Sequence, residues 1–539
     1  MAGLLASVSV TLHLRPRPEE KSSLIIKLPE KTFLIAAVFL AGLCSIVYEL
    51  LISTTSSYFL GDSVKQFSLT IGIYMFAMGV GSFLTKYIEK GELEAFIRTE
   101  MLLGLLGGLS VPLLYFLFQH QNNTQYQFTM LGLVFAIGLL TGLEIPLLAR
   151  VMKKYAPQND ALADVLGFDY IGALAATLLF PFLLLPFVGL YSSSLLFGAV
   201  NLLLGFGVCW FFRDQLERRQ RRRIYAYTAL GLMAFGLLLA WAKPFLAHWE
   251  ASAYPHRVIY QERSPYQQIT LTQNQDDLRL YLNRVIQFSS RDEYRYHEAL
   301  ALIPAASVPA VKRALILGGG EGLLARELLK LPELEQLTVV DLDERVFALA
   351  SRHGGIRALN AGAMESSKVQ ALAVDAAVFL RNDTNQYDLI IADLPDPSSE
   401  SVARLYSTWF FGMVKARLAV NGVFATQATS PFHTRNTFWC IRETLAATGF
   451  NHIRPYKVLV PSFGVWGFIM AGGTGHKPGL RTDVPRRFLE PEALPDMFYF
   501  PPDLRQPTDI NLLPNRLDRP VLLDYFLDEW SDWQREKTS

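Results

Sequence analysis

Cysteine is scarce in this sequence of 539 residues, and neither sign of charge is in excess. The three cysteines, Cys44, Cys209 and Cys440, lie far apart, which excludes a disulfide framework and the ligand spacing of a structural zinc site. We therefore expect packing roles for them and no bound metal. Lysine and arginine total 50 against 49 for aspartate and glutamate, so the net charge of +1 gives no case for a nucleic-acid partner.

A cleavable secretory signal is also missing. Residues 1–31 are polar and basic, but they have neither the compact charged start nor the small-residue cleavage site of such a signal. We interpret this segment as a cytoplasmic lead-in.

Apolar residues, by contrast, are abundant, at 51% of the chain with a mean hydropathy of +0.23. About seven apolar runs of roughly 18 to 25 residues are each long enough to cross a hydrocarbon core as a helix. A soluble core seldom contains so many long apolar segments with such short polar gaps, so we predict a transmembrane domain over residues 32–244. The runs cover residues 32–56, 66–85, 99–118, 128–149, 165–187, 191–212 and 224–242.

Four acidic residues fall inside these runs or at their edges, namely Glu49, Glu100, Glu144 and Asp169. An ionisable group at membrane depth costs roughly 3 kcal/mol or more on insertion scales. One interpretation is that each acid lies near a helix end or pairs with a backbone or hydroxyl group. The other is an internal binding site for a cation.

The densest basic run, Arg213–Arg223, lies between the sixth and seventh apolar runs. A nucleic-acid arm is one interpretation. A basic run beside a membrane helix is more typical of the cytoplasmic face, where anionic lipid neutralises it. We favour the membrane interpretation.

Beyond residue 244 the composition becomes that of a soluble domain. Two short strands at 269–272 and 278–282, with a polar turn between them, predict a hairpin in a small β-subdomain over residues 245–310. The tail, residues 475–539, is rich in proline and aromatic residues, and we expect it to wrap around the domain rather than to form a new one.

Strands alternate with helices across residues 311–474. This rhythm predicts a parallel sheet with helices on its faces, so the fold class is a membrane α-helical bundle followed by an α/β domain with a Rossmann-like sheet. The strands are expected at 314–317, 337–340, 369–374, 389–392 and 423–427.

One stretch, from Ala314 to Asp343, organises this domain. A strand leads into a glycine-rich loop that can turn sharply beside a ligand, and a helix over residues 323–331 follows. Asp341 ends the next strand about 20 residues beyond the glycines, where doubly wound folds hold the hydroxyls of a ribose. Glu321, inside the loop, would repel a pyrophosphate and attract a cationic group, so we expect a nucleoside that bears positive charge.

Three carboxylates stand at the ends of predicted strands: Asp341, Asp375 and Asp393. Taken singly, such an acid is more often a helix cap than a ligand. Because ligands bind where the carboxyl ends of parallel strands meet, the three acids together with Glu321 favour one crevice for a cationic nucleoside.

Residues 255–475 carry six recognisable motifs. They are YQQI at 266–269, LYLNRVIQFSSRDEYRYHE at 280–298, LILGGGEG at 315–322, VDLD at 340–343, DLPDP at 393–397 and LYSTWFF at 405–411. With these motifs the region resembles the spermidine synthases, or polyamine aminopropyltransferases, and with the apolar runs in front the chain is similar to the membrane-attached branch of that family. The resemblance implies a class I S-adenosylmethionine-binding fold and transfer of an aminopropyl group from decarboxylated S-adenosylmethionine to putrescine, which gives spermidine and methylthioadenosine without a cofactor.

The resemblance also implies roles for individual residues. Asp393 is the expected general base, since the acceptor must lose a proton before its nitrogen attacks carbon. The donor is expected to bind Gln267, Gly318, Gly320, Glu321, Asp341, Asp375 and Ala376. The acceptor is expected to bind Gln287, Tyr296, Glu298 and Asp396, although a structural network at the domain seam is the alternative for the last three.

The chain departs from the family pattern at three places. The family usually has aspartate at the position of Glu321, Asp-Ser-x-Asp-Pro where this chain has Asp393–Pro397, and a tyrosine near the position of Phe463. Losing a phenolic hydroxyl weakens recognition of one amine position by about 1 kcal/mol. Putrescine is the expected acceptor, with longer diamines and triamines left open.

Two rival functions use the same features. A methyltransferase would bind S-adenosylmethionine on the same fold, but Glu321 and Asp396 speak against a carboxylated donor. A polyamine transporter or sensor would use the soluble domain only as a receptor, and the presence of Asp393 argues for turnover instead. We also hypothesise that Glu49, Glu144 and Asp169 form a path or docking site for polyamine cations.

Two features of the sequence give opposite predictions for the side of the membrane on which residues 245–539 lie. Basic residues mark the cytoplasmic ends of alternate runs, and seven crossings from a cytoplasmic start would place residues 245–539 outside. The donor implied by the resemblance is a cytoplasmic metabolite. We expect a multi-pass protein of the bacterial plasma membrane with a cytoplasmic catalytic domain, one apolar run failing to cross, and assembly into a homo-oligomer, either a dimer or a tetramer.

Overall fold

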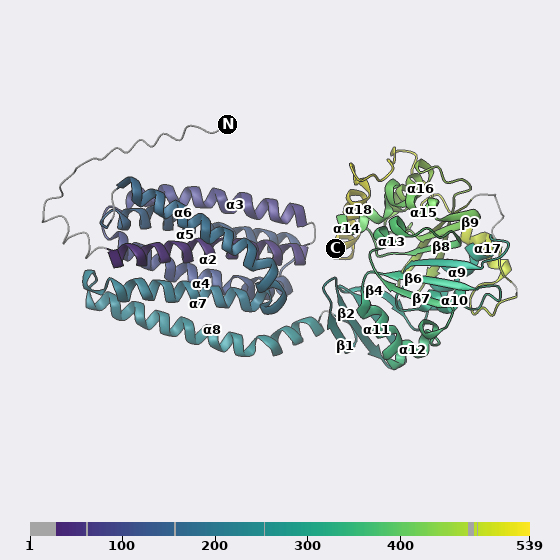
Figure 1. The fold of residues 1–539 in the computed structure, drawn as a ribbon, viewed down its shortest axis with the longest axis horizontal. Coiled ribbons are helices and arrows are strands. Elements are labelled where there is room, and N and C mark those ends of the chain that lie inside the picture. The colour runs from purple at the N-terminus through teal and green to yellow at the C-terminus, as the bar shows by residue number, and fades with distance from the viewer. Residues whose placement is uncertain are drawn as a thin grey trace, which may run out of the picture. The chain divides into compact units, whose positions relative to one another are not determined.

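The structure is a computed structural model that describes residues 28–60, 63–155, 158–252, 254–472, 479–481 and 483–538. The chain divides into two compact units, Met1–His248 and Trp249–Ser539, called here the helical unit and the sheet unit (Figure 1). Most of the predicted lead-in, residues 1–27, lies outside the described residues.

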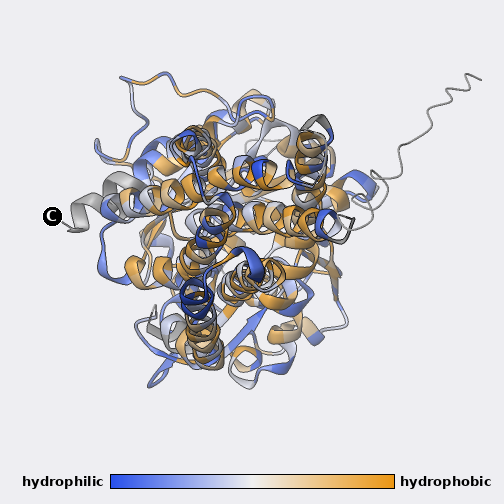
Figure 2. Cartoon of the chain, turned by 90° about the vertical axis from the view of Figure 1, so that its left-hand side faces the viewer, coloured by the Kyte–Doolittle hydropathy of each residue, from blue (hydrophilic) through white to orange (hydrophobic). Residues whose placement is uncertain are grey.

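Each predicted apolar run is helical, and every helix begins before the predicted start. The second and sixth helices end one residue before the predicted limits, and the predicted run 165–187 is divided between the fifth helix and a π-helical segment. Seven helices in the described part of the chain are long and apolar enough to cross a membrane, and Figure 2 shows apolar colour along most of their length. The sixth helix begins directly after a π-helical segment, η2 (Phe180–Val188), that contains Pro181 and Pro186. The helices are α2 (Leu28–Leu60), α3 (Ser63–Leu84), α4 (Glu92–His120), α5 (Asn123–Met152), α6 (Gln158–Leu179), α7 (Leu190–Phe211) and α8 (Arg218–Ser252).

Glycine sets the closest helix contacts in this unit. Helix α3 packs along α5, α4 along α7, and α2 along α6. A Cβ atom on Gly81 would lie 2.1 Å from the carbonyl oxygen of Leu139, and one on Gly142 would lie 2.1 Å from that of Met78. No larger residue fits between these backbones, so the small residues fix the α3–α5 distance.

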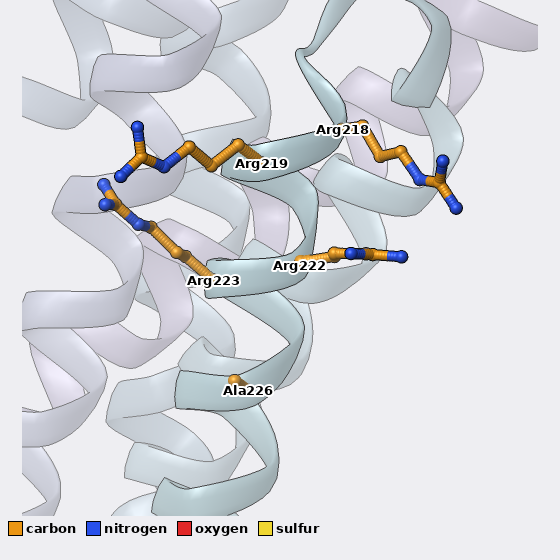
Figure 3. Close-up of a pocket in the computed structure, with 5 residues that line it drawn as sticks. All are labelled: Arg218, Arg219, Arg222, Arg223 and Ala226. Atoms are coloured by element: carbon orange, nitrogen blue, oxygen red, sulfur yellow. The ribbon is translucent and has the colours of Figure 1, made fainter.

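The N-terminal end of α8 carries the predicted basic run. Four arginines line a cavity of about 460 Å³ together with Ala226, and Figure 3 shows Arg219 and Arg223 side by side while Arg218 and Arg222 extend the other way. All four side chains are exposed, and within the described part of the chain none of them forms an ion pair with an acid. Positive charge at a helix N-terminus opposes the helix dipole, so the cavity favours an anion.

The sheet unit begins with the predicted β-subdomain. Its four strands form an antiparallel sheet in the order β1-β2-β3-β4, and the predicted hairpin is the β2–β3 pair with a tight turn at Gln275. The strands are β1 (Arg257–Arg263), β2 (Gln268–Asn274), β3 (Asp277–Leu282) and β4 (Val285–Ser289).

A seven-stranded sheet follows, in the order β10-β11-β9-β8-β5-β6-β7. The five predicted strands are present and parallel, but β11 pairs antiparallel with β9, and β10 pairs antiparallel with β11. The predicted parallel sheet is therefore a mixed sheet, because a short turn near Phe463 joins its last two strands as a hairpin. The strands are β5 (Arg313–Gly318), β6 (Gln336–Asp341), β7 (Val369–Ala373), β8 (Tyr387–Asp393), β9 (Leu418–Gln427), β10 (Arg454–Val460) and β11 (Gly464–Gly472).

Helices cover both faces of this sheet. The alternation of side chains along β5 separates two cores, since Ala314 and Ile316 belong to one and Leu315 and Leu317 to the other. The helices are α9 (Glu293–Ala305), α10 (Leu323–Leu328), α11 (Glu344–Arg352), α12 (Gly354–Leu359), α13 (Ala376–Asn382), α14 (Glu400–Ala403), α15 (Thr408–Ala416), α16 (Arg435–Ala447), α17 (Leu494–Phe498) and α18 (Val521–Thr538).

The tail contributes to both cores. Leu489 and Met497 pack with the core on one face, and Leu512 and Leu522 pack with the core on the other. It is thus an integral part of the sheet unit.

Candidate active site

The glycine loop lies at the carboxyl end of β5, an inner strand between β8 and β6. Gly318, Gly319 and Gly322 have φ values of +90°, +65° and +85°, which side chains rarely adopt. A Cβ atom on Gly318 would lie 1.9 Å from the backbone oxygen of Asp393 on the neighbouring strand β8. Glycine is required here because the loop turns in contact with that strand.

Asp341 ends β6 and is held by the loop. Its Oδ2 accepts a hydrogen bond of 3.1 Å from the backbone N–H of Gly320, and its Oδ1 accepts one of 3.0 Å from that of Asp343. Burial raises the pKa of Asp341 to about 6, and the charge of Glu321 acts in the same direction, while the two backbone hydrogen bonds oppose them. The side chain is an acceptor placed where the sequence predicts a ribose.

Gln267 joins the same region through a residue that the sequence did not single out. Its Nε2 donates to Asp343 Oδ2 at 3.0 Å, and the hydroxyl of Ser264 donates to the same oxygen at 2.6 Å. The other oxygen of Asp343 caps helix α11 by accepting from the N–H of Arg345 at 3.0 Å. The VDLD motif contained this signal, since its second aspartate stands just before a helix.

Asp375 and Ala376 start helix α13. The Oδ1 atom of Asp375 accepts from the N–H groups of Ala377 and Val378 at 2.9 and 3.1 Å, and its Oδ2 pairs with Arg404 at 2.5 Å. The capping role that the sequence left open is therefore present. The donor-binding role of these two residues stays a prediction.

Asp393 ends β8 beside the glycine loop. The hydroxyl of Tyr296, on α9, donates to its Oδ1 at 2.5 Å. Burial raises the pKa of Asp393 to about 7, and the charge of Glu321 adds to the rise, whereas His297 and the Tyr296 hydrogen bond oppose it. A carboxyl group with a pKa close to neutrality is suited to accept a proton.

Glu321 meets a histidine that sequence reasoning missed. The carboxylate lies 3.7 Å from His297 Nε2, and His297 Nδ1 lies 2.8 Å from Glu293 Oε2. Both oxygens of Glu293 also accept from Arg326 at 2.8 Å. Burial alone would lower the pKa of His297, but the hydrogen bond to Glu293 and the negative charges of Glu293 and Glu321 dominate and raise it to about 10. His297 is therefore a buried cation beside Glu321.

His297, Glu321 and Asp393 also place ligand atoms within 4.8 Å of one another, a grouping that could hold a metal ion. A metal ligand must be a neutral imidazole, and a pKa of about 10 means that His297 carries both protons at neutral pH. The donor set therefore fits charge pairing with a protonated histidine better than metal ligation.

Asp396 and the aromatic residues beside it complete the cleft. Burial raises the pKa of Asp396 to about 7 against a hydrogen bond from Gln427, and its buried Oδ1 has no hydrogen-bond partner among the described residues. The ring of Phe463 meets Tyr296 edge-on at 6.2 Å and Trp466 at 5.4 Å. A buried carboxyl oxygen without a hydrogen-bond donor is suited to an organic cation.

Of the other two predicted acceptor residues, Glu298 has a structural role, and the role of Gln287 stays a prediction. Glu298 is 1% exposed, and its carboxylate accepts three backbone N–H groups of the tail, at 2.6, 2.9 and 3.1 Å. The structure corrects the prediction for Glu298, because both of its oxygens already anchor residues 487–489. Gln287 donates to the carbonyl of Val285 on its own strand at 3.2 Å, and within the described residues no hydrogen bond links it to the carboxylate cluster.

Comparison with known proteins gives consistent matches. The model of the spermine/spermidine synthase domain matches residues 293–479. Polyamine aminopropyltransferase 2 of Ralstonia nicotianae is 41% identical over 503 residues, which are 92% of this chain and 98% of that protein. The polyamine aminopropyltransferase of Leptospira interrogans is 39% identical over 505 residues, covering 93% and 99% of the two chains.

Among solved structures, this chain is similar to a spermidine synthase in complex with the transition-state analogue AdoDATO. The identity is 23%, the TM-score is 0.40, and the match covers 51% of this chain and 88% of that one. A spermidine synthase from Thermotoga maritima matches with a TM-score of 0.38 and the same identity.

Proposed function

The chain belongs to the polyamine aminopropyltransferase family and is therefore a transferase, and we propose that it is a membrane-bound enzyme that converts putrescine to spermidine. The family uses decarboxylated S-adenosylmethionine as the co-substrate and needs no cofactor. The match spans the helical unit as well as the sheet unit, since it covers 92% of the chain.

The observation that carries the proposal is the position of Asp393. It pairs in register with Gly318 of the glycine loop, so the proposed base and the proposed donor loop adjoin. Tyr296 holds one carboxylate oxygen, which leaves the other free to face a substrate. The pKa of about 7 lets the group accept a proton at neutral pH and release it afterwards.

The reaction is a substitution at carbon. The lone pair of the acceptor amine forms the new N–C bond, the C–S bond of the sulfonium breaks, and its electron pair stays on sulfur to give neutral methylthioadenosine. The proton lost by the nitrogen goes to Asp393. The sheet unit supplies alignment and charge, since Glu321 and Asp396 are acids that can pair with the ammonium groups of donor and acceptor.

Donor choice rests on Glu321. Its Oε1 is buried and lies 3.7 Å from His297 Nε2, but it accepts no hydrogen bond from the described residues, so it can accept one from the ammonium group of a donor that lacks a carboxylate. The carboxylate of ordinary S-adenosylmethionine would face a like charge at this place, which disfavours that donor.

The test uses the purified full-length chain with decarboxylated S-adenosylmethionine and one amine at a time. With putrescine we expect spermidine and methylthioadenosine in equal amounts. Cadaverine and spermidine serve as competing acceptors, and S-adenosylmethionine serves as a competing donor. A preference for the carboxylated donor would overturn the donor assignment, and a higher kcat/KM with a longer amine would replace putrescine as the acceptor.

The helical unit supports the membrane part of the proposal. Among the described residues it has seven helices of spanning length, and the arginines at the start of α8, which form no ion pair in the described part of the chain, line a cavity suited to a phosphate of anionic lipid. We place the sheet unit in the cytoplasm, where the donor is made. Because seven crossings from a cytoplasmic start would end outside, this placement requires that one of the seven helices does not cross. A reporter fused after Ser539 and active in only one compartment tests this, and activity outside the cytoplasm would contradict it.

The assembly state is the last part of the proposal. We expect a homo-oligomer, a dimer or a tetramer, and the mass of the detergent-solubilised particle measures it. A monomeric mass would contradict this expectation.

A further inference from the structure

Two acids that lie far apart in the sequence meet in the core of the helical unit. Glu100 on α4 and Glu144 on α5 are 0% and 2% exposed, and their carboxyl groups are in hydrogen-bonding contact with each other. The sequence had placed both in apolar runs without showing that they share a site.

The pair is held by side chains from two more helices. The amide of Asn201, on α7, donates from Nδ2 to Glu100 Oε2 at 2.7 Å. The hydroxyl of Tyr48, on α2, donates to Asn201 Oδ1 at 3.1 Å. A Cβ atom on Gly107 would lie 2.4 Å from the Tyr48 ring, so glycine at that position makes room for this arrangement. Four helices thus build one buried polar site.

One carboxyl oxygen of each acid lacks a hydrogen-bond donor within the described residues. The Oε1 atoms of Glu100 and Glu144 are buried and have no hydrogen-bond partner in the part of the chain that the structure describes. A buried, unsatisfied carboxyl oxygen costs free energy unless a donor reaches it. Two such oxygens in adjacent carboxyl groups need either a proton shared between the groups or N–H groups supplied by a ligand.

The chemistry of the site indicates which class of ligand can donate hydrogen bonds to these two oxygens. Calcium and magnesium take six or more oxygen ligands, which two carboxyl groups and one amide do not supply. An alkylammonium group carries three N–H donors on one positive charge and matches two free carboxylate oxygens. We propose that Glu100 and Glu144 bind one ammonium group of a polyamine inside the helical unit.

A proton occupies the site when the amine is absent. Two adjacent carboxylates in apolar surroundings cannot both be ionised, so the empty pair shares one proton and carries one negative charge. Binding of an ammonium group releases that proton, and the site again carries one negative charge. The exchange of one proton for one ammonium leaves the buried charge unchanged.

This site differs from the path hypothesised from the sequence. Glu49 and Asp169 are only half-buried, whereas Glu100 joins Glu144 directly. The amine as occupant rests on the proposed function, but the paired acids do not.

The test measures spermidine binding to the detergent-solubilised full-length chain by equilibrium dialysis with labelled spermidine. We expect about two equivalents for the parent, one in each unit, and about one for Glu144→Gln, with the aminopropyl transfer rate unchanged. Glu49→Gln is the matched control and should still bind about two equivalents. A parent that binds a single equivalent, or a Glu144→Gln chain that binds two, overturns the inference and leaves the proposed function intact.

A second measurement needs no variant. Dicyclohexylcarbodiimide adds to a protonated carboxyl group in apolar surroundings, and peptide mass spectrometry locates the adduct. We expect labelling of Glu100 or Glu144 in the parent, and protection by spermidine but not by an equal concentration of a neutral diol. Labelling that spermidine does not change, or no labelling of either residue, contradicts the site even if Glu144→Gln fails to fold.

Discussion

The two halves of the candidate active site in the sheet unit differ in the groups that form them. The half proposed for the donor centres on one stretch of backbone, residues 318–343, in which the N–H groups of Gly320 and Asp343 donate to Asp341. The half proposed for the acceptor is assembled from side chains of α9, β8 and the turn before β11, with Tyr296 as the group that holds Asp393.

The difference sets the protonation of the acids. Backbone N–H groups stabilise the ionised form of Asp341, whose pKa is raised only to about 6. Asp393 and Asp396 receive fewer such contacts, and burial raises the pKa of each to about 7. A cleft that must hold one substrate and deprotonate another benefits from this division, because an acid that stays ionised binds a hydroxyl or cation while one near neutrality moves a proton.

The largest expected effect separates the halves directly. Asp393→Asn keeps the hydrogen-bonding shape but cannot accept a proton, so kcat should fall by about a hundredfold or more. Asp341→Asn is the matched change in the other half and should chiefly raise the KM for the donor. Steady-state kinetics with both substrates measure the two variants, and an unchanged kcat in Asp393→Asn would remove this residue from the mechanism.

The pH dependence should show the same division without a mutation. Since Asp393 must be ionised to act as a base, kcat should fall about tenfold per pH unit below pH 7, or roughly a hundredfold by pH 5. The KM for the donor should begin to rise only below about pH 6, where Asp341 takes up a proton. A kcat that stays constant from pH 8 to pH 5 would contradict the assignment of the base.

These contrasts explain what the sequence could predict. The donor half lies in one short stretch, so its glycines, Glu321 and Asp341 were recognisable from spacing, and the five parallel strands were recognisable as apolar runs. The antiparallel hairpin β10–β11 at the edge of the sheet was not predicted, because the sequence of a single strand does not determine which strand it pairs with. The role of His297 depends on Glu321 and Arg326, which are distant in sequence, so no local pattern showed it.

Glu298 shows most clearly what a sequence motif cannot predict. It is two residues after Tyr296 on α9, and two residues turn a helix by about 200°. Tyr296 therefore faces Asp393 while Glu298 faces the tail. The motif at 280–298 contains both residues, but its sequence does not predict which of the two side chains faces the substrate.

The third prediction separates these two faces of α9. Glu298→Gln replaces a carboxylate oxygen with an N–H₂ group opposite backbone donors, so the sheet unit should lose about 2 kcal/mol of stability with little change in the KM for putrescine. Tyr296→Phe should do the reverse, lowering kcat with little change in stability. Denaturant unfolding and kinetics on the same preparations measure both, and a raised putrescine KM in folded Glu298→Gln would restore its predicted role.

The smallest expected effect concerns the wall of the acceptor half. Phe463 meets the edge of Tyr296 and offers no polar group, whereas the family pattern has a tyrosine near this position. Phe463→Tyr adds one hydroxyl that can contact an amine, a gain of about 1 kcal/mol, so the KM for putrescine should fall roughly fivefold while kcat stays the same. Phe432→Tyr, on a ring that is 58% exposed, is the matched control. The ratio of kcat/KM for putrescine to that for cadaverine measures the effect on specificity. If that ratio is unchanged in Phe463→Tyr, the ring does not select the amine, and selection then falls to the acids Asp393 and Asp396, whose spacing would have to distinguish the diamines by length.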